Sequence, residues 1–352
     1  MPSECTVAAS GGSEWKCDED PCMISDEVLR NVRAAGLSWR AANYSQFQGK
    51  KLKDGLIYKL GTLPLSRETA RLGPIIYDKD IPYPPQFDAR QHWKNYISPV
   101  VDQGWCGSDW AVFFLCHVCV YKHTSSHSHD TQTRNNNLWI TQRVASCGNR
   151  TRYTLKPRQP CSWSVTLPIL CLVLFKDSVK FAIQSNGAEK VILSPQTLLS
   201  CNRKQQQGCR GGNIDTAWIF AKNHGLVDED CFPYKAKFTE CPFRKRGNLL
   251  TDRCVPVIPQ PVMTVYQDFF HYQDGVYRRS RFGNNELKGL HSVRIVGWGE
   301  DNQDKYWIVA NSWGTAWGED GYFRIARGEN ESGIESFVVT VLSDVTEAYL
   351  RK

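Results

Sequence analysis

The stretch Gln103-Gly104-Trp105-Cys106-Gly107-Ser108-Asp109-Trp110 decides which fold this sequence of 352 residues predicts. Two blocks much later in the chain belong with it. His291 opens an alternating apolar run that ends in Gly297-Trp298-Gly299, a pattern typical of a strand and its turn. Asn311 follows His291 by 20 residues and opens the block Asn311-Ser312-Trp313-Gly314. A lone histidine beside an apolar strand is usually a core or surface residue, but the Asn-Ser-Trp-Gly block favours a functional role for His291.

These blocks resemble those of a known family. Papain-type cysteine peptidases carry the signature Cys-Gly-[Ser/Ala]-Cys-[Trp/Tyr]; Cys106 matches its first cysteine, and Asp109 stands where the second, catalytic cysteine belongs. With the run Gly208-Cys209-Arg210-Gly211-Gly212, the chain resembles the papain family (peptidase C1) and, within it, the cathepsin B branch. The likeness is greatest to the non-catalytic tubulointerstitial nephritis antigen-like group. It implies an α+β fold with two lobes, one helical and one a small β-barrel, facing each other across a cleft.

The resemblance also implies a role for each site residue. In a working enzyme His291 would take the proton of the nucleophile, and Asn311 would orient the histidine ring. Gln103 would donate to the oxyanion that forms during the reaction. Asp109 begins the central helix at the nucleophile position, where serine is the replacement expected in the non-catalytic relatives.

Asp109 changes the chemistry of this position. A carboxylate beside His291 can form an ion pair that is similar in charge to a thiolate–imidazolium pair. Its attack on an amide, however, would produce a mixed anhydride, a poor route compared with attack by a thiolate. Loss of a catalytic nucleophile typically lowers the rate by several orders of magnitude. The sequence therefore predicts no measurable peptidase activity.

The 14 cysteines are many for a cytosolic protein, and together with the resemblance they predict an oxidising, secreted setting. The resemblance implies that Cys106 pairs with Cys209 and that Cys241 pairs with Cys254, with buried free thiols as the alternative. The first residues have neither the basic start nor the apolar core of a signal peptide. We therefore expect the chain to be incomplete at its start.

A departure from the family lies after Cys254. The chain passes almost directly from Cys254 into the run Pro261-Val262-Met263-Thr264-Val265-Tyr266, which resembles a later strand of the family. The segment that normally lies between them supplies cysteines, so Cys201 and Cys231 are expected to have lost their partners. The pairing of three N-terminal cysteines stays open: Cys5, Cys17 and Cys22.

Residues 114–176 also break the family pattern. They contain eight basic residues and one acidic residue, which account for the whole formal net charge of +7. The rest of the chain is neutral, so neither nucleic-acid binding nor a general basic face is predicted. The polar, unpatterned composition predicts an irregular basic insertion in the central helix. Because such an interruption should expose apolar helix faces, our hypothesis is that residues 114–176 are translated intron or a gene-model error.

No cofactor and no metal site are predicted. The run Cys116-His117-Val118-Cys119 lacks the second spaced pair that would complete a zinc site. Residues 161–175 are apolar, but they are too few to cross a membrane and contain Pro168, so no membrane span is predicted.

The sequence predicts two parts. Residues 1–80 form a cysteine-containing N-terminus and a propeptide-like segment, and residues 81–345 form the papain-like domain interrupted by 114–176. Polar capping residues predict three helix starts, at Ser25, Ser194 and Asn213. In active relatives the propeptide lies in the cleft and is removed; without a nucleophile for self-cleavage, we expect it to stay attached here.

Three interpretations of the function follow. We favour a secreted, non-catalytic papain-fold protein that binds extracellular matrix or other secreted proteins. The second is an active papain-like cysteine endopeptidase, which would need a rescuing thiol near His291. The third is an aberrant gene product that does not fold, suggested by residues 114–176 and by the segment missing after Cys254.

Overall fold

The structure is a computed structural model. It describes residues 6–7, 15–16, 20–65, 84–92, 94, 97, 99–112, 117–118, 163–164, 191–224, 226–227, 229, 231–242 and 260–341. Almost all of the predicted insertion at 114–176 lies outside these ranges, as do Cys5, Cys17 and Cys254. Helices and strands are mixed along the described chain, as the predicted α+β class requires.

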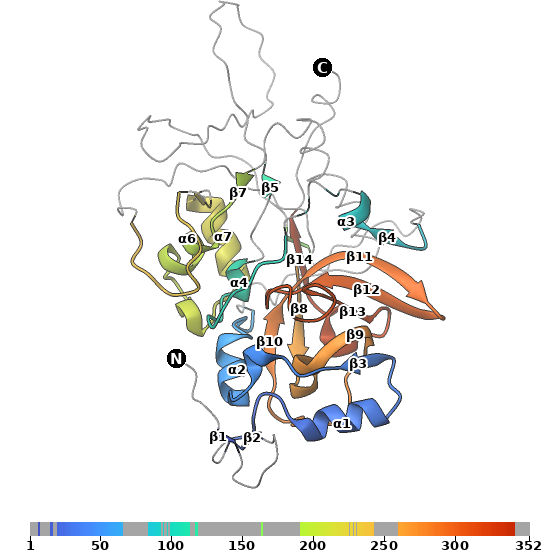
Figure 1. Ribbon diagram of the computed structural model, residues 1–352. Coiled ribbons are helices and arrows are strands. Elements are labelled where there is room, and N and C mark those ends of the chain that lie inside the picture. The colour runs from blue at the N-terminus through green and yellow to red at the C-terminus, as the bar shows by residue number, and fades with distance from the viewer. Residues whose placement is uncertain are drawn as a thin grey trace, which may run out of the picture.

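Short helices gather on one side of the molecule, at the left of Figure 1. Helix α4 (Asp109–Val112) contacts both α6 (Pro195–Cys201) and α7 (Ile214–His224), and a 3-10 turn, η3 (Gly208–Arg210), contacts α6. Ser194 caps α6 as predicted, because its side chain accepts a hydrogen bond from the Thr197 amide. Helix α7 begins directly after Asn213, again as predicted.

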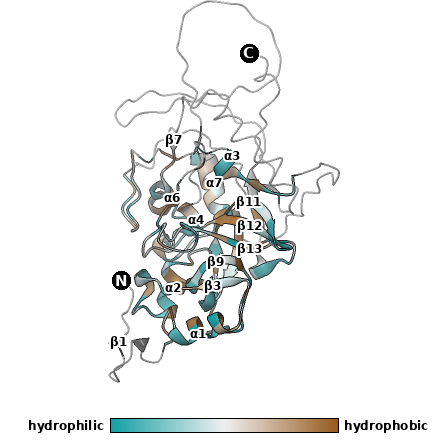
Figure 2. Cartoon of the chain, turned by 45° about the vertical axis from the view of Figure 1, so that its right-hand side comes forward, coloured by the Kyte–Doolittle hydropathy of each residue, from teal (hydrophilic) through white to brown (hydrophobic). Residues whose placement is uncertain are grey.

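The opposite side of the molecule is built on a six-stranded sheet in the order β3-β9-β13-β12-β11-β4. Its strands are β3 (Trp39–Ala41), β4 (Phe87–Asp88), β9 (Tyr272–Tyr277), β11 (Arg294–Asp301), β12 (Asp304–Ala310) and β13 (Tyr322–Ala326). Strands β11 and β12 form an antiparallel hairpin, and β9 runs parallel to β13. Figure 2 shows that this hairpin is hydrophobic along the body of its strands and hydrophilic where they join.

A second sheet has the order β10-β8-β14-β6. Its strands are β6 (Trp163–Ser164), β8 (Gln260–Val265), β10 (Gly289–Ser292) and β14 (Val338–Val341). The remaining strands form two antiparallel pairs, β1 (Thr6–Val7) with β2 (Trp15–Lys16) and β5 (His117–Val118) with β7 (Val191–Ile192). Three further helical elements are α3 (Ala89–His92), η4 (Gln267–His271) and η5 (Glu331–Gly333).

Two clusters of buried hydrophobic residues fill these two sides. The larger one packs the six-stranded sheet and is rich in aromatic rings, with Phe269 contacting both Trp313 and Trp317. The smaller one joins α4, α6 and α7 around Trp110 and Leu198. Aromatic side chains bury large areas, so these rings account for much of the hydrophobic stabilisation. The site described below lies where α4 contacts β10.

Residues 20–65, here called the N-terminal segment, are built into this fold. Helix α1 (Asp26–Ala34) begins after Ser25, whose hydroxyl accepts from the Val28 amide, and ends two residues before Gly36. Strand β3 pairs with β9 and so adds an edge strand to the six-stranded sheet. The 3-10 turn η1 (Ser45–Phe47) and helix α2 (Leu52–Tyr58) then lead toward the helical side.

The disulfides differ in part from the prediction. Cys106 is bonded to Cys209, the pair that the resemblance implied. Cys241 is bonded to Cys201, so its predicted pairing with Cys254 is wrong, and Cys201 has not lost its partner. The reason is spatial: α6 ends at Cys201, 5.0 Å from Cys241 between Cα atoms, within disulfide reach. Cys231 is also disulfide-bonded, so the expectation that it lacks a partner is wrong as well.

The described ranges contain neither a membrane-spanning helix nor a metal site. No helix there combines the length and the apolar character that crossing a bilayer requires. No group of three histidine, cysteine or acidic side chains there is arranged to hold a metal ion.

Candidate functional site

Asp109 is held at the start of α4 by the loop that precedes it. The disulfide from Cys106 to Cys209 ties this loop to η3, and the Gly107 amide donates to the Cys209 carbonyl at 2.8 Å. The Ser108 carbonyl then accepts from the amides of Ala111 and Val112. Asp109 is fully buried, so its position is set by the covalent and hydrogen-bonded framework around it.

His291 and Asn311 come from the strands facing α4. His291 lies in β10, and Asn311 directly follows β12. The Nε2 atom of His291 is 2.8 Å from Oδ1 of Asn311, and its Nδ1 atom is 3.0 Å from Oδ2 of Asp109. The Trp313 ring stacks on the imidazole, with 5.2 Å between ring centroids. The structure therefore brings together three of the four predicted site residues in one buried hydrogen-bonded line.

Each nitrogen of the imidazole faces an acceptor oxygen. Oδ1 of Asn311 also accepts from the Ser312 amide at 2.7 Å, so it faces the ring as an acceptor. Nδ1 of His291 thus lies within hydrogen-bonding distance of the carboxylate of Asp109, and Nε2 within that of Asn311. The carboxylate stands at the distance from the ring that the predicted ion pair requires.

The Asp109 carboxylate is also bonded to the N-terminal segment. Its Oδ1 accepts from the Gly61 amide at 2.7 Å, and its Oδ2 accepts from the Thr62 hydroxyl at 2.6 Å. Oδ2 accepts in addition from the Ser292 amide at 2.9 Å. With His291 this makes four donors to a single buried carboxylate. Oδ1 thus accepts one of these bonds and Oδ2 accepts three.

The N-terminal segment runs through the site as an extended chain. Gly61 and Leu63 bond to Gly212 on one side, through Gly212 N to Gly61 O at 2.8 Å and Leu63 N to Gly212 O at 2.9 Å. On the other side Thr62 forms an antiparallel bridge with Leu290 of β10. A Cβ atom on Gly61 would lie 2.0 Å from the Gly107 carbonyl oxygen, so only glycine fits at this crossing. Backbone therefore fills the space in front of Asp109.

Gln103, the predicted oxyanion donor, is bonded to main-chain carbonyls. Its Nε2 donates to the Cys106 carbonyl at 2.9 Å and lies 3.3 Å from the Tyr58 carbonyl oxygen. Its Oε1 accepts from the Ser312 hydroxyl at 2.5 Å. The amide that would face a developing oxyanion thus faces the N-terminal segment instead.

Lys59 anchors the same segment from inside the protein. Its side chain is almost fully buried, with Nζ 3.9 Å from Asp102 and 5.2 Å from the centre of the Trp105 ring. Burial lowers the pKa of Lys59 to about 8, an effect that the Asp102 charge partly offsets. The Lys59 carbonyl accepts from the indole nitrogen of Trp313 at 3.2 Å.

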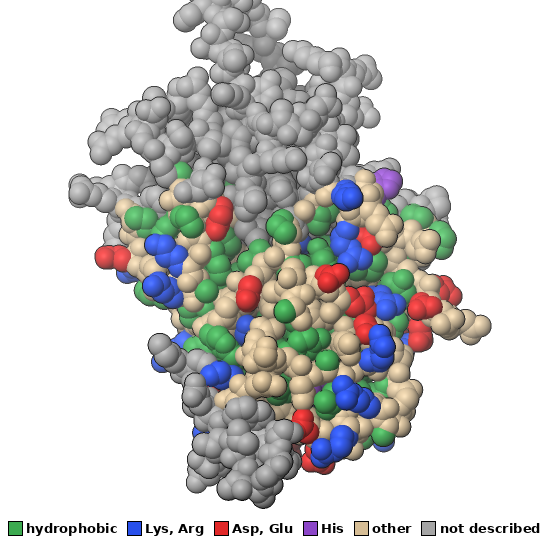
Figure 3. Space-filling view, viewed as in Figure 1, with side chains coloured by type: hydrophobic (Ala, Val, Ile, Leu, Met, Phe, Trp, Pro, Cys, Tyr) green, Lys and Arg blue, Asp and Glu red, His purple; other side chains and the backbone are tan. Residues whose placement is uncertain are grey.

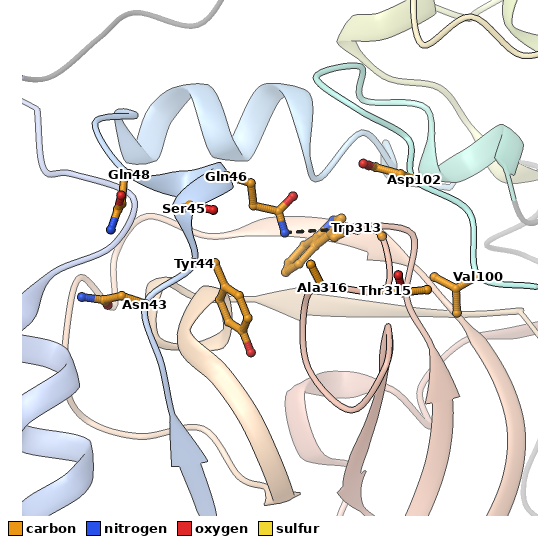
Figure 4. A pocket seen from close by; sticks show the side chains of 11 residues that line it. Asn43, Tyr44, Ser45, Gln46, Gln48, Val100, Asp102, Trp313, Thr315 and Ala316 are labelled. Carbon is orange, nitrogen blue, oxygen red and sulfur yellow. Dashed lines mark hydrogen bonds between the residues drawn. The ribbon is translucent and has the colours of Figure 1, made fainter.

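An open pocket of about 680 Å³ lies beside the site. Figure 4 shows that its wall has two sources: residues 43–48 of the N-terminal segment, and the facing side chains of Asp102, Trp313 and their neighbours. Gln46 closes one side by donating to the Trp313 carbonyl at 3.3 Å. The pocket exists in this form only while the N-terminal segment is in place.

Sequence reasoning missed the residues that the segment contributes. Gly61, Thr62 and Lys59 contact the predicted site, yet none of them belongs to a motif, because an extended chain in a cleft has no local periodicity. The one usable signal was the expectation that a propeptide-like segment stays in the cleft. Ser292 was also missed, although it directly follows His291.

Comparisons with known proteins place the chain in a family. The family model described as "Papain family cysteine protease" matches residues 177–261 and 253–342. The "Tubulointerstitial nephritis antigen-like" protein of Mus musculus is 30% identical over 385 residues, covering 94% of this chain and 70% of that protein. The "Cathepsin B-like CP3" of Giardia intestinalis is 28% identical over 347 residues, covering 91% of this chain and 94% of that protein.

Solved structures show the same fold. "ProCathepsin B S9 from Trypanosoma congolense" superposes with a TM-score of 0.57 at 23% identity, covering 92% of this chain and 100% of that one. At this identity the likeness concerns the fold alone, whereas the match to the Mus musculus protein extends to the sequence. The chain belongs to the papain family of cysteine proteases, in the cathepsin B-like branch that includes the tubulointerstitial nephritis antigen-like proteins.

Proposed function

We propose that this chain is a catalytically inactive, secreted, cathepsin B-like protein that acts by binding extracellular matrix or secreted proteins. The observation that carries the proposal is the buried Asp109 carboxylate, which stands at the nucleophile position and bonds to the protein's own N-terminal segment. The Asp109 carboxylate therefore has a structural role, because it links the N-terminal segment to the rest of the fold.

Among the residues that the structure describes, no sulfur is placed to replace the missing nucleophile. All six cysteines in the described ranges are disulfide-bonded, so none of them supplies a free thiolate beside His291. The nearby hydroxyls of Thr62 and Ser292 bond to each other, and Thr62 also bonds to Asp109. Neither hydroxyl faces the imidazole as serine does in a hydrolytic triad.

Access by a peptide substrate is also blocked. The backbone around Gly61 fills the space in front of Asp109, and Gln103 is bonded to main-chain carbonyls. In a peptidase this part of the N-terminal segment, here called the plug, would have to leave the cleft before any reaction. Here the residue that replaces the nucleophile adds two hydrogen bonds to the plug, which favours its retention.

The secreted setting is supported by the disulfides. Disulfides such as those of Cys106 and Cys201 persist in oxidising compartments, which agrees with secretion. With the cleft filled, ligands would have to bind the outer surface. The face in Figure 3 carries basic and acidic side chains interspersed, so charge of one sign does not dominate it.

Active-site labelling tests the proposal. Wild-type protein, Asp109→Cys and Asp109→Ser are incubated with a thiol-directed peptidyl epoxide, and adducts are located by peptide mapping. We expect an adduct at position 109 only in Asp109→Cys, and no hydrolysis of peptide substrates by the wild type or by Asp109→Ser. Wild-type peptidase activity that is lost in His291→Ala would overturn the proposal. Binding of the purified wild type to cell-deposited matrix tests the second half, and absence of binding at micromolar concentration would contradict it.

A further inference from the structure

The connection between β9 and β10, residues 278–288, carries four basic side chains and is here called the cationic loop. One of them, Arg278, is neutralised because it pairs with Glu329 at 2.8 Å and with Asp304 at 3.0 Å. The other three, Arg279, Arg281 and Lys288, are exposed. Within the described part of the chain none of these three forms an ion pair.

Two of the unpaired cations share one aromatic ring. The guanidinium of Arg279 lies 3.6 Å from the centre of the Tyr266 ring, and the Lys288 ammonium lies 6.0 Å from the same centre. Asn285 bridges Arg279 to the backbone at Arg281: its Oδ1 accepts from Arg279 at 3.1 Å, and its Nδ2 donates to the Arg281 carbonyl at 3.1 Å. The Tyr266 ring thus brings two of the positive charges together, and Asn285 holds the part of the loop backbone that carries the third.

Hydrogen bonds to buried side chains fix the loop backbone. The Ser280 amide donates to Asp268 at 2.7 Å, and the Asn284 amide donates to Gln267 at 2.6 Å. Oδ1 of Asn284 then accepts from the amides of Glu286 and Leu287. A loop held in this way loses little conformational entropy when it binds a ligand. This favours a role of the loop in binding a ligand over that of a charged surface that contacts only solvent.

Few negative charges oppose the cluster. Glu286 is the only acidic residue in the loop. Asp268 lies beneath the loop, but it is buried and accepts from Ser280 and Tyr277. Three exposed cations against one exposed carboxylate leave a local positive charge on a chain that is neutral outside residues 114–176.

We propose that the cationic loop binds a sulfated polysaccharide. Sulfate esters stay charged at every physiological pH, and the stacked guanidinium of Arg279 presents fixed N–H groups that suit bidentate bonds to such oxyanions. The choice of polyanion rests on the proposed extracellular function, because nucleic acids are intracellular whereas the disulfides indicate an oxidising compartment. A polysaccharide also carries several sulfates on one chain, so it can engage the three cations together.

Heparin binding by the full-length protein tests the proposal. The test variant is Arg279→Ala/Arg281→Ala/Lys288→Ala, and the matched control removes three exposed cations on the helical side, Lys204→Ala/Lys235→Ala/Lys237→Ala. Surface plasmon resonance on immobilised heparin is run at several salt concentrations. We expect the loop variant to bind about tenfold or more weakly and with a shallower salt dependence, and the control to bind like the wild type.

Three results would overturn the proposal: no wild-type binding at physiological salt, equal loss in both variants, or equal wild-type binding to chemically desulfated heparin. Binding of the loop to anionic phospholipid vesicles as tight as to heparin would also contradict it, because the surface would then lack the proposed preference. Circular dichroism of both variants confirms that they fold. The peptidase assays above are independent of heparin, so failure here leaves the proposed inactivity standing, and the reverse holds as well.

Discussion

The hydrogen bonds from Asp109 to the N-terminal segment should make this residue a major contributor to stability, although it occupies a catalytic position. Three variants separate the contributions of these hydrogen bonds to the free energy of unfolding. Asp109→Ala removes the carboxylate, Asp109→Asn keeps one carbonyl oxygen and the size of the side chain, and Thr62→Val removes only one of the four donors.

The magnitude follows from the donors that lose their acceptor. In Asp109→Ala the Ser292 amide keeps the Thr62 hydroxyl as an acceptor, but the Gly61 amide and Nδ1 of His291 are left buried without one. Removing one partner of a buried charged pair costs about 3–5 kcal/mol. We therefore expect the free energy of unfolding to fall by about 4 kcal/mol in Asp109→Ala, and by about 2–3 kcal/mol in Thr62→Val, which loses a hydrogen bond to a charged group and the bond between the Thr62 and Ser292 hydroxyls. Asp109→Asn should lie between them.

Urea denaturation measures the global effect, and amide hydrogen exchange at Gly61 measures the local one. If the carboxylate holds the segment, a loss of about 4 kcal/mol in Asp109→Ala speeds exchange at Gly61 on the order of a thousandfold, because each 1.4 kcal/mol is tenfold. Glu300→Ala is the control, because its side chain is exposed on β11 and no hydrogen bond or ion pair joins it to the N-terminal segment in the described ranges. An Asp109→Ala variant within about 0.5 kcal/mol of the wild type, with Gly61 still protected, would refute the reasoning.

The remaining predictions concern buried ionisable groups. Burial lowers the pKa of His271 to about 4 and raises that of Asp268 to about 6. The histidine therefore lowers stability as the pH falls from 6.5 through 4, whereas the aspartate raises it as the pH falls from 6 through 3.8, each by about 3 kcal/mol. Urea titrations should find that the free energy of unfolding of the wild type is nearly constant between pH 6 and 4. As the pH falls through this range, Asp268→Asn should lose stability and His271→Asn should gain it. Parallel curves of stability against pH for all three proteins would contradict this. For Lys59 the folded pKa of about 8 lies below the unfolded value of 10.5, so stability should rise between these two pH values. Lys59→Met should stabilise the protein at pH 7 by up to about 3 kcal/mol and remove that rise, and destabilisation by this variant at pH 7 would show that the ammonium is a net favourable contact.

The parts of the fold that were predictable are those with local signals. Ser25 and Ser194 cap helices where expected, because a capping hydroxyl acts within three residues of its own position. The neighbourhood of Asp109, His291 and Asn311 was predictable for another reason: each lies in a motif whose spatial partners are implied by the family resemblance.

The parts that were missed depend on distances between remote segments. Cys241 lies nearer in sequence to Cys254 than to Cys201, but a disulfide forms between side chains that the fold brings together, and α6 carries Cys201 to Cys241. The contact of Gly61 with Asp109 has the same character. The two residues are 48 positions apart, and the contact joins an extended segment to the start of a helix. No local sequence pattern therefore predicts it.

The same contact bears on why a carboxylate, rather than the expected serine, occupies position 109. A serine hydroxyl has one proton and two lone pairs, so it could not accept from Gly61, Thr62, Ser292 and His291 together. The carboxylate accepts from all four, once at Oδ1 and three times at Oδ2. Two of these donors belong to the N-terminal segment and two to β10, so the carboxylate joins the plug to the wall of its cleft. A serine at this position would accept fewer of these hydrogen bonds, so it would hold the plug less tightly than the aspartate does.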